Sequence, residues 1–257
     1  MRVLVTGAFG WTAVSIVQAL ERAGHEITAF DLPSAACPDE IAGLFNQVFL
    51  GNVANFDDVH AATQAIDAIV HLAVAVGKDD YRDPDTPFAV NVKGTYNVFE
   101  SARRRGVSAI VLLSSAAVHL AHADGEIIHA LKDWKSATAE DHLYDLTKRL
   151  QEEIARDFCD TFQMSAVVLR AGHIVDGRKQ VDPKGRPLST LDYCRGGWVC
   201  RYDLATACVK ALQLRTSGYN AFHVIGAIEA EQHYDVERTR QELGIAFETR
   251  FEQFAMT

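Results

Sequence analysis

Tyr144 and Lys148 stand four residues apart in the stretch YDLTK. Residues at this spacing share one face of a helix, so their side chains are neighbours. A lysine ammonium favours the ionised form of a nearby tyrosine, and we expect it to lower the tyrosine pKa from its usual value of about 10. The pair therefore predicts a general base that can take the proton of a substrate hydroxyl.

A serine lies upstream of this pair, at the end of the apolar run AIVLLSS. Ligands of parallel sheets bind in the crevice outside the carboxyl ends of the strands. Ser115, at the end of such a strand, can hydrogen-bond a substrate hydroxyl or carbonyl while Tyr144 moves its proton.

The N-terminal stretch TGAFGWTA follows a short apolar strand and precedes an amphipathic helix. Gly7 and Gly10 stand where such a turn lets backbone N–H groups approach a pyrophosphate. Ala13 replaces the third glycine of the dinucleotide fingerprint, which serves the packing of helix on strand rather than phosphate contact. Asp31 ends the next strand, where a carboxylate takes the ribose hydroxyls and repels the additional phosphate of NADP. The pattern predicts a site for NAD.

Short apolar runs alternate with longer amphipathic stretches along the chain. We predict strands at 2–5, 26–30, 48–50, 68–72, 109–114, 166–170 and 221–225, and helices at 13–23, 56–64, 87–105, 143–159, 202–214 and 235–243. This alternation requires a parallel sheet with helices on both faces, because parallel strands need crossover connections. We therefore expect an α/β fold, a Rossmann-type doubly wound parallel sheet, with residues 1–257 as a single NAD-binding domain. Residues 171–197 have a loop composition, and we expect a small C-terminal substrate lobe built mainly from 171–200 and 226–257.

The composition excludes several classes of partner. The chain has 257 residues and a formal net charge of -9, so neither nucleic acid nor an anionic membrane is expected to bind it. No apolar run is long enough for a transmembrane helix, and no basic region followed by an apolar run opens the chain. The five cysteines form no C-x-x-C pair, and no cysteine–histidine framework indicates a metal site. We expect a cytoplasmic protein with reduced thiols and no bound metal.

These motifs stand in the order of a known family. The sequence resembles the extended short-chain dehydrogenases/reductases, the NAD-dependent epimerase/dehydratase family. The matching segments are TGAFGWTA, Asp31, GNV at 51–53, HLA at 71–73, NVKGT at 91–95, SSAAV at 114–118, YDLTK at 144–148, LRAG at 169–172, YDLA at 202–205 and VERTRQELG at 236–244. The resemblance implies that Ser115, Tyr144 and Lys148 form the catalytic set. It implies a cofactor site made of Gly7, Phe9, Gly10, Trp11, Asp31, Asn52, Val53, Leu72, Ala73, Asn91, Tyr144 and Lys148, with Lys148 on the nicotinamide ribose.

The chain departs from the family pattern at several places. Asn52 stands where an aspartate usually reads the adenine amino group, and its amide oxygen can still accept that hydrogen bond. Asn91 matches a helix asparagine whose role is mainly to brace the strand edges. The proline-rich run before Tyr144 is missing, so we expect a substrate other than the common nucleotide sugars. His119 replaces a frequent tyrosine, and the roles of His119 and His173 stay open.

The residues after Ser115 bear on the reaction. Sugar dehydratases of the family carry an Asp-Glu pair where this chain has Ala116 and Ala117, and two methyl groups cannot transfer protons. The short segment after Lys148 favours a small substrate, and compact family members include uronate dehydrogenases, with weak similarity in RPLSTLDYCRGGWVCRYDLA. Basic residues of this region suit a carboxylate, or else belong to a solvated loop: Arg170, Arg178, Lys179, Lys184, Arg186, Arg195 and Arg201.

We therefore expect an NAD-dependent oxidoreductase that acts on a hydroxyl or carbonyl of a small polar, sugar-derived molecule. Two alternatives stay open at this point. One is an NAD-dependent sugar epimerase that holds its cofactor tightly, and the other is a non-catalytic NAD-binding regulatory protein. Helices of the family often pair in dimers, so the resemblance also implies a homodimer through the helices expected at 87–105 and 143–159.

Overall fold

A parallel sheet receives strands from nearly the whole chain. The computed structural model describes residues 1–75, 77, 79–107, 109–121, 139–191, 194–214 and 216–255. Within these residues seven strands pair in the order β3-β2-β1-β4-β5-β6-β9, and every pair is parallel. They are β1 (Arg2–Thr6), β2 (Glu26–Asp31), β3 (Gln47–Leu50), β4 (Ala68–His71), β5 (Ala109–Ser115), β6 (Ser165–Ala171) and β9 (Gly218–Val224). The predicted Rossmann-type α/β fold is confirmed.

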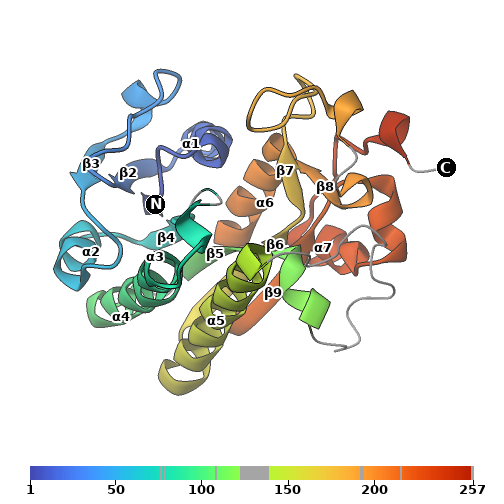
Figure 1. Cartoon of the computed structure of the whole chain (residues 1–257). Helices are drawn as coiled ribbons and strands as arrows, with labels where there is room; N and C mark the ends of the chain where they lie inside the picture. The colour runs from blue at the N-terminus through green and yellow to red at the C-terminus, as the bar shows by residue number, and fades with distance from the viewer. Residues whose placement is uncertain are drawn as a thin grey trace.

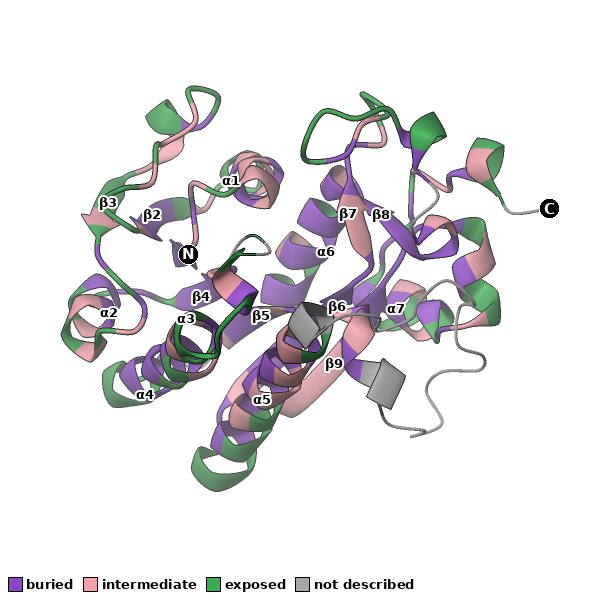
Figure 2. Cartoon of the chain, viewed as in Figure 1, coloured by how far each residue is buried: buried purple, intermediate pink, exposed green. Residues whose placement is uncertain are grey.

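Helices cover both faces of this sheet (Figure 1). One face carries α1 (Trp11–Arg22) and α6 (Arg201–Gln213), and the other carries α2 (Phe56–Ala62), α4 (Gly94–Arg105) and α5 (Ala139–Phe162). Successive strand residues point to opposite faces, so in β1 Val3 and Val5 join the first core and Leu4 joins the second. Figure 2 shows the helices buried on the side that faces the sheet. Burial on both faces explains why the strand segments are continuous apolar runs.

The strand order changes direction beside β1. From β1 the chain adds β2 and β3 on one side, and then returns to place β4 on the other side of β1. In open parallel sheets, ligands bind outside the carboxyl ends of the strands at such a switch point. The last paired residues of β1 and β4 are Thr6 and His71, so the glycine-rich turn after Thr6 lies at this point.

The single helix expected at 87–105 consists of different segments in the structure. A short α3 (Asp85–Pro87) is followed by a π-helix over Phe88–Lys93, which continues into α4 at Gly94. A π-helix closes its hydrogen bonds one residue later than an α-helix, and such segments occur frequently at functional sites. Asn91 lies within the π-helix and is fully buried.

A smaller core forms beyond β6. β7 (His173–Val175) and β8 (Trp198–Cys200) pair in parallel, so one short strand lies within the segment 171–197 that has a loop composition and a second follows it directly. Trp198 is fully buried, and its ring meets the rings of Phe251 and Phe254 edge to face, with centroids 5.7 and 5.6 Å apart. α7 (Val236–Leu243) packs against β9 nearby. The division into one domain with a substrate lobe stays a prediction.

Candidate active site

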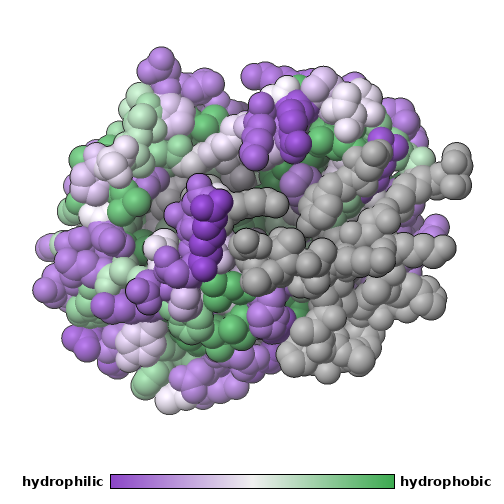
Figure 3. All heavy atoms as spheres, in the orientation of Figure 1, coloured by the Kyte–Doolittle hydropathy of each residue, from purple (hydrophilic) through white to green (hydrophobic). Residues whose placement is uncertain are grey.

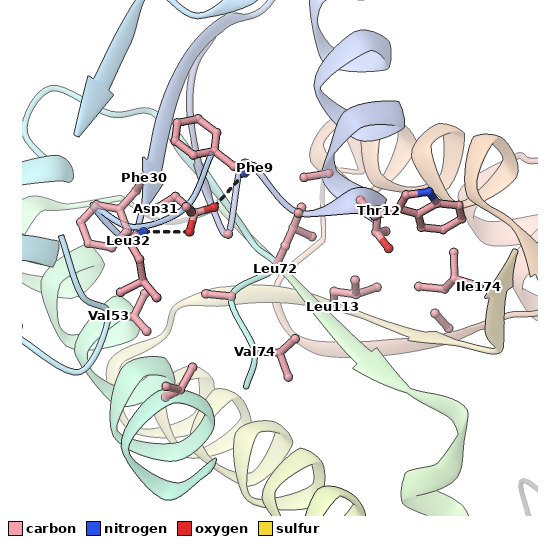
Figure 4. Close-up of a pocket in the computed structure, with 18 of the residues that line it drawn as sticks. Phe9, Thr12, Phe30, Asp31, Leu32, Val53, Leu72, Val74, Leu113 and Ile174 are labelled. Atoms are coloured by element: carbon pink, nitrogen blue, oxygen red, sulfur yellow. Dashed lines mark hydrogen bonds between the residues drawn. The ribbon is translucent and has the colours of Figure 1, made fainter. Parts of the chain in front are cut away.

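A cavity of about 570 Å³ opens at the carboxyl ends of the central strands. The predicted site residues that line it are Gly7, Phe9, Gly10, Trp11, Asp31, Asn52, Val53, Leu72, Ala73, Ser115, Tyr144 and Lys148. Figure 4 shows Phe9 and Asp31 on one side of this cavity and Leu113 and Ile174 on the other. A single cavity therefore joins the predicted cofactor cradle to the predicted catalytic residues.

Gly7 makes the turn from β1 in a conformation that favours glycine. Its φ is +68°, and a Cβ atom at this position would lie 2.8 Å from the backbone nitrogen of Ala73. The N–H of Gly10 donates to the Gly7 carbonyl over 3.2 Å, and α1 begins directly afterwards at Trp11. The first N–H groups of a helix have no acceptor within the helix, and they favour an anion. The turn therefore fits a pyrophosphate.

Ala13 occupies the position of the third glycine of the fingerprint. It is buried and belongs to the core that α1 and α6 form with the sheet. The methyl group fills part of the space between helix and strand, so this departure from the fingerprint is accommodated by packing.

The Asp31 carboxylate lies beside the glycine-rich turn (Figure 4). Its Oδ2 accepts a hydrogen bond from the N–H of Phe9 and its Oδ1 one from the N–H of Leu32, both over 2.8 Å. A carboxylate oxygen can accept more than one hydrogen bond, so both oxygens can also accept ribose hydroxyls. Its charge opposes the additional phosphate of NADP, as the sequence predicts.

Asn52 lines the cavity next to Val53. Its Oδ1 accepts a hydrogen bond from the N–H of Ala54 over 2.9 Å, and its own N–H donates to Asp58 over 2.9 Å. The amide oxygen that was expected to meet adenine therefore already stabilises a local turn, although its second lone pair can accept another donor.

Asn91 does not line the cavity, although the resemblance placed it in the cofactor set. Its Oδ1 accepts a hydrogen bond from the N–H of Ala75 over 2.8 Å, and its Nδ2 donates to Tyr81 Oη and to Thr147 Oγ1, each over 3.0 Å. Asn91 thus connects the loop after β4 to α5, and acts behind the wall of the site as a brace.

Tyr81 packs against Tyr144, and no pattern in the sequence indicates this contact. The two rings meet edge to face with their centroids 5.6 Å apart, and the Tyr81 hydroxyl donates to the carbonyl of Ala75 over 3.0 Å. Tyr81 is buried, yet it belongs to the polar stretch KDDYRDPD, which has no strand or helix periodicity.

Tyr144 is the candidate general base. Burial raises the pKa of Tyr144 to about 12, a hydrogen bond with Ser115 opposes this change, and the nearby Asp145 carboxylate adds to it. The lowered pKa expected from the pairing with Lys148 is therefore not found. The reason is that the loss of hydration destabilises the phenolate more than the neighbouring groups stabilise it.

Lys148 lies between Tyr144 and β5. Its Nζ donates to the carbonyl of Leu113 over 2.9 Å and lies 6.0 Å from the centre of the Tyr144 ring. Burial lowers the pKa of Lys148 to about 8, and the Glu152 carboxylate acts in the opposite direction. An ammonium group has three N–H donors, so two are left for a ligand in the cavity.

None of the basic residues of 170–201 is among the described residues that line the cavity. Arg170 is buried and forms an ion pair with Glu152 at 2.8 Å. The Arg201 guanidinium stacks on Trp11, 4.1 Å from the ring centre. These two side chains are held by contacts within the protein.

His173 is not among the described residues that line the cavity. It is in β7, where burial lowers its pKa and Asp182 opposes this. The side chain of His119 and most of the loop before Tyr144 lie outside the described residues. Among the residues that are described, no group of His, Cys, Asp and Glu could hold a metal ion, and no helix is long and apolar enough to span a membrane.

The sequence is similar to those of known proteins. The NAD dependent epimerase/dehydratase family matches residues 3–190. A 3-beta-hydroxysteroid dehydrogenase of Mycolicibacterium neoaurum is 30% identical over 159 residues, which are 59% of this chain and 42% of that protein. A uronate dehydrogenase of Pseudomonas syringae is 28% identical over 171 residues, which are 66% of this chain and 58% of that protein. The chain spans about half the length of these curated relatives.

A solved structure has the same fold. It is a short-chain dehydrogenase/reductase superfamily protein of Agrobacterium tumefaciens with bound NAD, similar with a TM-score of 0.74 at 20% identity over 99% of this chain and 94% of that one. The family match covers the glycine-rich turn, Asp31, Ser115, Tyr144 and Lys148. The chain therefore belongs to the NAD-dependent epimerase/dehydratase family, and its cofactor is NAD.

Proposed function

We propose that the protein is an NAD-dependent oxidoreductase that oxidises or reduces a hydroxyl or carbonyl group of a small polar, sugar-derived molecule. The observation that carries this proposal is the cavity that Ser115, Tyr144 and Lys148 share with the glycine-rich turn and Asp31. A cofactor in the cradle and a proton acceptor at Tyr144 would face the same substrate. Membership of the family supports the same class of reaction.

Ser115, Tyr144 and Lys148 have different roles in the proposed reaction. When bound, NAD supplies the acceptor for a hydride from the carbon that bears the hydroxyl. The Ser115 hydroxyl, which is hydrogen-bonded with Tyr144, holds the substrate oxygen. Tyr144 takes the hydroxyl proton as general base, and returns it in the reverse direction. Burial favours the neutral tyrosine, so the charge of Lys148 is needed to support the phenolate.

We propose that the lobe of 171–200 and 226–257 selects the substrate. Ala171, Gly172, Ile174 and Pro183 contribute to the wall of the cavity. The uronate dehydrogenase and hydroxysteroid dehydrogenase relatives suggest the probes: uronic acids, neutral aldoses and a 3-beta-hydroxysteroid, each supplied with NAD. Absorbance of NADH measures turnover, and we expect it with a sugar-derived probe.

The decisive variant is Tyr144→Phe. Phenylalanine keeps the ring contact with Tyr81 but has no group that can accept a proton, so we expect turnover to fall by about 10²–10⁴-fold or more. The affinity for NAD should be nearly unchanged, because Phe retains the shape of the wall. Turnover by rapid mixing and NAD binding by calorimetry measure the two effects. Unchanged turnover in this variant would rule out Tyr144 as the proton acceptor.

The same assays separate two other functions. An epimerase begins with the same hydride transfer but returns the hydride, so it would convert a sugar without accumulating NADH and would retain NAD through purification. A regulatory protein would bind NAD and exchange no hydride with any probe. Steady accumulation of NADH with a probe is the result that the oxidoreductase proposal requires.

We also propose a homodimer that forms through α4 and α5. Phe88 and Tyr96 are large apolar residues with 38% and 49% of their surface exposed, and Phe162 at the end of α5 is 44% exposed. Adjacent hollows are lined by Val92, Tyr96, Leu150, Ile154 and Phe158. Figure 3 shows apolar side chains gathered on the lower part of this face, where α4 and α5 lie in Figure 1. A second copy would remove these side chains from water.

The cytoplasm is the compartment that we propose for this protein. All five cysteines are free thiols in the structure, and most of them are buried. Free thiols persist where the compartment is reducing. Cell fractionation with antibody detection tests this assignment.

A further inference from the structure

Glu152 is a buried carboxylate one helical turn beyond Lys148 on α5. It pairs with Arg170 of β6, whose Nη2 and Nε donate to Glu152 Oε2 over 2.8 and 3.1 Å. Both side chains are almost fully enclosed, with 5% of the surface of Glu152 and 7% of that of Arg170 exposed. A buried charge pair of this kind is costly to form, and replacing it with apolar residues often stabilises a protein. Its presence beneath the site therefore calls for a role beyond stability.

Glu152 ties α5 to three strands of the sheet. Apart from Arg170 in β6, it accepts hydrogen bonds from Ser114 Oγ of β5 over 2.5 Å and from Tyr219 Oη of β9 over 2.7 Å. Hydrogen bonds to a charged acceptor are stronger than those between neutral groups. The carboxylate thus fixes the position of α5 over the carboxyl half of the sheet, where Figure 1 shows α5 lying across these strands.

Three residues of α5 contact the last three residues of β5. The Lys148 ammonium donates to the carbonyl of Leu113, the Glu152 carboxylate accepts from the side chain of Ser114, and Tyr144 interacts with Ser115. Glu152 therefore holds the same end of β5 that the two α5 residues of the proposed site contact.

Glu152 also supplies negative charge next to Lys148. It acts against burial, which lowers the pKa of Lys148 to about 8. His71 of β4 adds no charge beside Lys148, because burial and the Lys148 charge lower its pKa to about 3 and leave it neutral. The other titratable and charged groups in and around this site include Tyr144, Asp145, Glu152 and Arg156 on α5, Tyr81 and Asp31 at the wall near Tyr144 and the glycine-rich turn, His71 on β4, Arg170 on β6 and Tyr219 on β9.

We propose that Glu152 is a positioning residue that acts on the site through Lys148, by keeping the Lys148 ammonium charged and by holding α5 against the end of β5. This inference rests on the proposed function, because Lys148 must be positively charged to support Tyr144. Arg170 has a related role, because its hydrogen bonds and charge lower the pKa of Glu152 and keep this carboxylate ionised within the protein.

The test measures the titration of Lys148 without relying on turnover. Acetic anhydride labels the neutral amine, and mass spectrometry of the Lys148 peptide as a function of pH gives the midpoint of its titration. In Glu152→Gln, which keeps the shape but removes the charge, we expect the midpoint to fall by about 1 pH unit, the size that one nearby charge produces. The alkaline limb of kcat/KM for NAD should move in the same direction, and the affinity for NAD at alkaline pH should weaken with it.

Tyr219→Phe is the matched control. It removes one hydrogen bond from Glu152 and leaves the carboxylate charged, so the Lys148 midpoint should stay where it is in the parent. If Glu152→Gln fails to fold with Arg170 left unpaired, the double variant Glu152→Gln/Arg170→Met removes both charges and should show the same downward shift. An unshifted midpoint in the folded variant, or an equal shift in Tyr219→Phe, overturns the inference. A parent protein with no turnover would instead overturn the proposed function, because labelling does not depend on turnover.

Discussion

At the scale of single residues, Gly7 is the position where the lack of a side chain matters for both folding and cofactor binding. Its φ of +68° is unfavourable for other residues, and a Cβ atom would press on the backbone of Ala73 at 2.8 Å. We expect Gly7→Ala to lower the free energy of unfolding by about 1–3 kcal/mol and to weaken NAD binding, since the turn must move. Chemical denaturation and NAD titration by calorimetry measure the two losses.

Gly43→Ala serves as the control for this change. No atom lies within 4 Å of the Cβ position at Gly43, so alanine fits there without displacement. The control should bind NAD like the parent and unfold at a similar denaturant concentration. If Gly7→Ala behaved like the control, the close approach of the turn to Ala73 would not be a constraint.

The sequence alone predicts those site residues whose relative positions are determined by local spacing. Tyr144 and Lys148 share a helical face at four residues' separation, and Gly7 and Asp31 stand at fixed places after strands. Glu152 and Tyr81 were not found, because their partners Arg170 and Tyr144 are distant in the sequence. The pKa of Tyr144 was predicted in the wrong direction, because burial is a property of the folded protein and here outweighs the hydrogen bond with Ser115.

At the scale of elements, the π-helix Phe88–Lys93 is the segment that braces the site. It buries Asn91, which holds the N–H of Ala75 and the side chains of Tyr81 and Thr147. In Asn91→Ala the buried N–H of Ala75 loses its acceptor, and Tyr81 and Thr147 each lose one hydrogen bond, so we expect a loss of about 1–3 kcal/mol in the free energy of unfolding. Because Tyr81 packs on Tyr144, kcat should fall more than the affinity for NAD.

Asn220→Ala is a suitable comparison for the brace. The Asn220 side chain, at the start of β9, donates to the carbonyl of Ser217 just before this strand, so its removal should change kcat very little. Stopped-flow turnover and thermal unfolding of the two variants side by side test the assignment. Equal effects in both variants would mean that Asn91 has no special connection with the site.

The order of the elements was predictable because the strands are short continuous apolar runs and the helices have an amphipathic period. The segment 87–105 has the hydrophobic period of one amphipathic helix. The wider turn of its first part depends on the long-range contacts of Asn91, and a hydrophobic period carries no information about such contacts. β7 and β8 were missed because each has only three residues, too few to show alternation. Their pairing depends instead on the burial of Trp198 against the distant Phe251 and Phe254.

At the scale of the whole molecule, charge and apolar surface act in opposite directions on self-association. Each copy carries a formal net charge of -9, which makes two copies repel at low ionic strength. The face formed by the π-helix, α4 and α5 exposes Phe88, Tyr96 and Phe162, whose burial favours association. If the proposed dimer forms through this face, added salt should strengthen it by screening the repulsion.

Tyr96→Glu tests the dimer directly. Tyr96 lines both hollows on the α4 and α5 face, so a carboxylate there would lose its hydration when a second copy covers it. We expect sedimentation velocity to show a dimer for the parent and a monomer for this variant at the same concentration, with NAD binding retained because the cavity lies elsewhere. Leu50→Glu is the matched control, since Leu50 is 57% exposed on the edge strand β3, away from these helices. A dimer that survived Tyr96→Glu but dissociated in Leu50→Glu would place the interface at the sheet edge, whereas a parent that is a monomer at every salt concentration would exclude the dimer altogether.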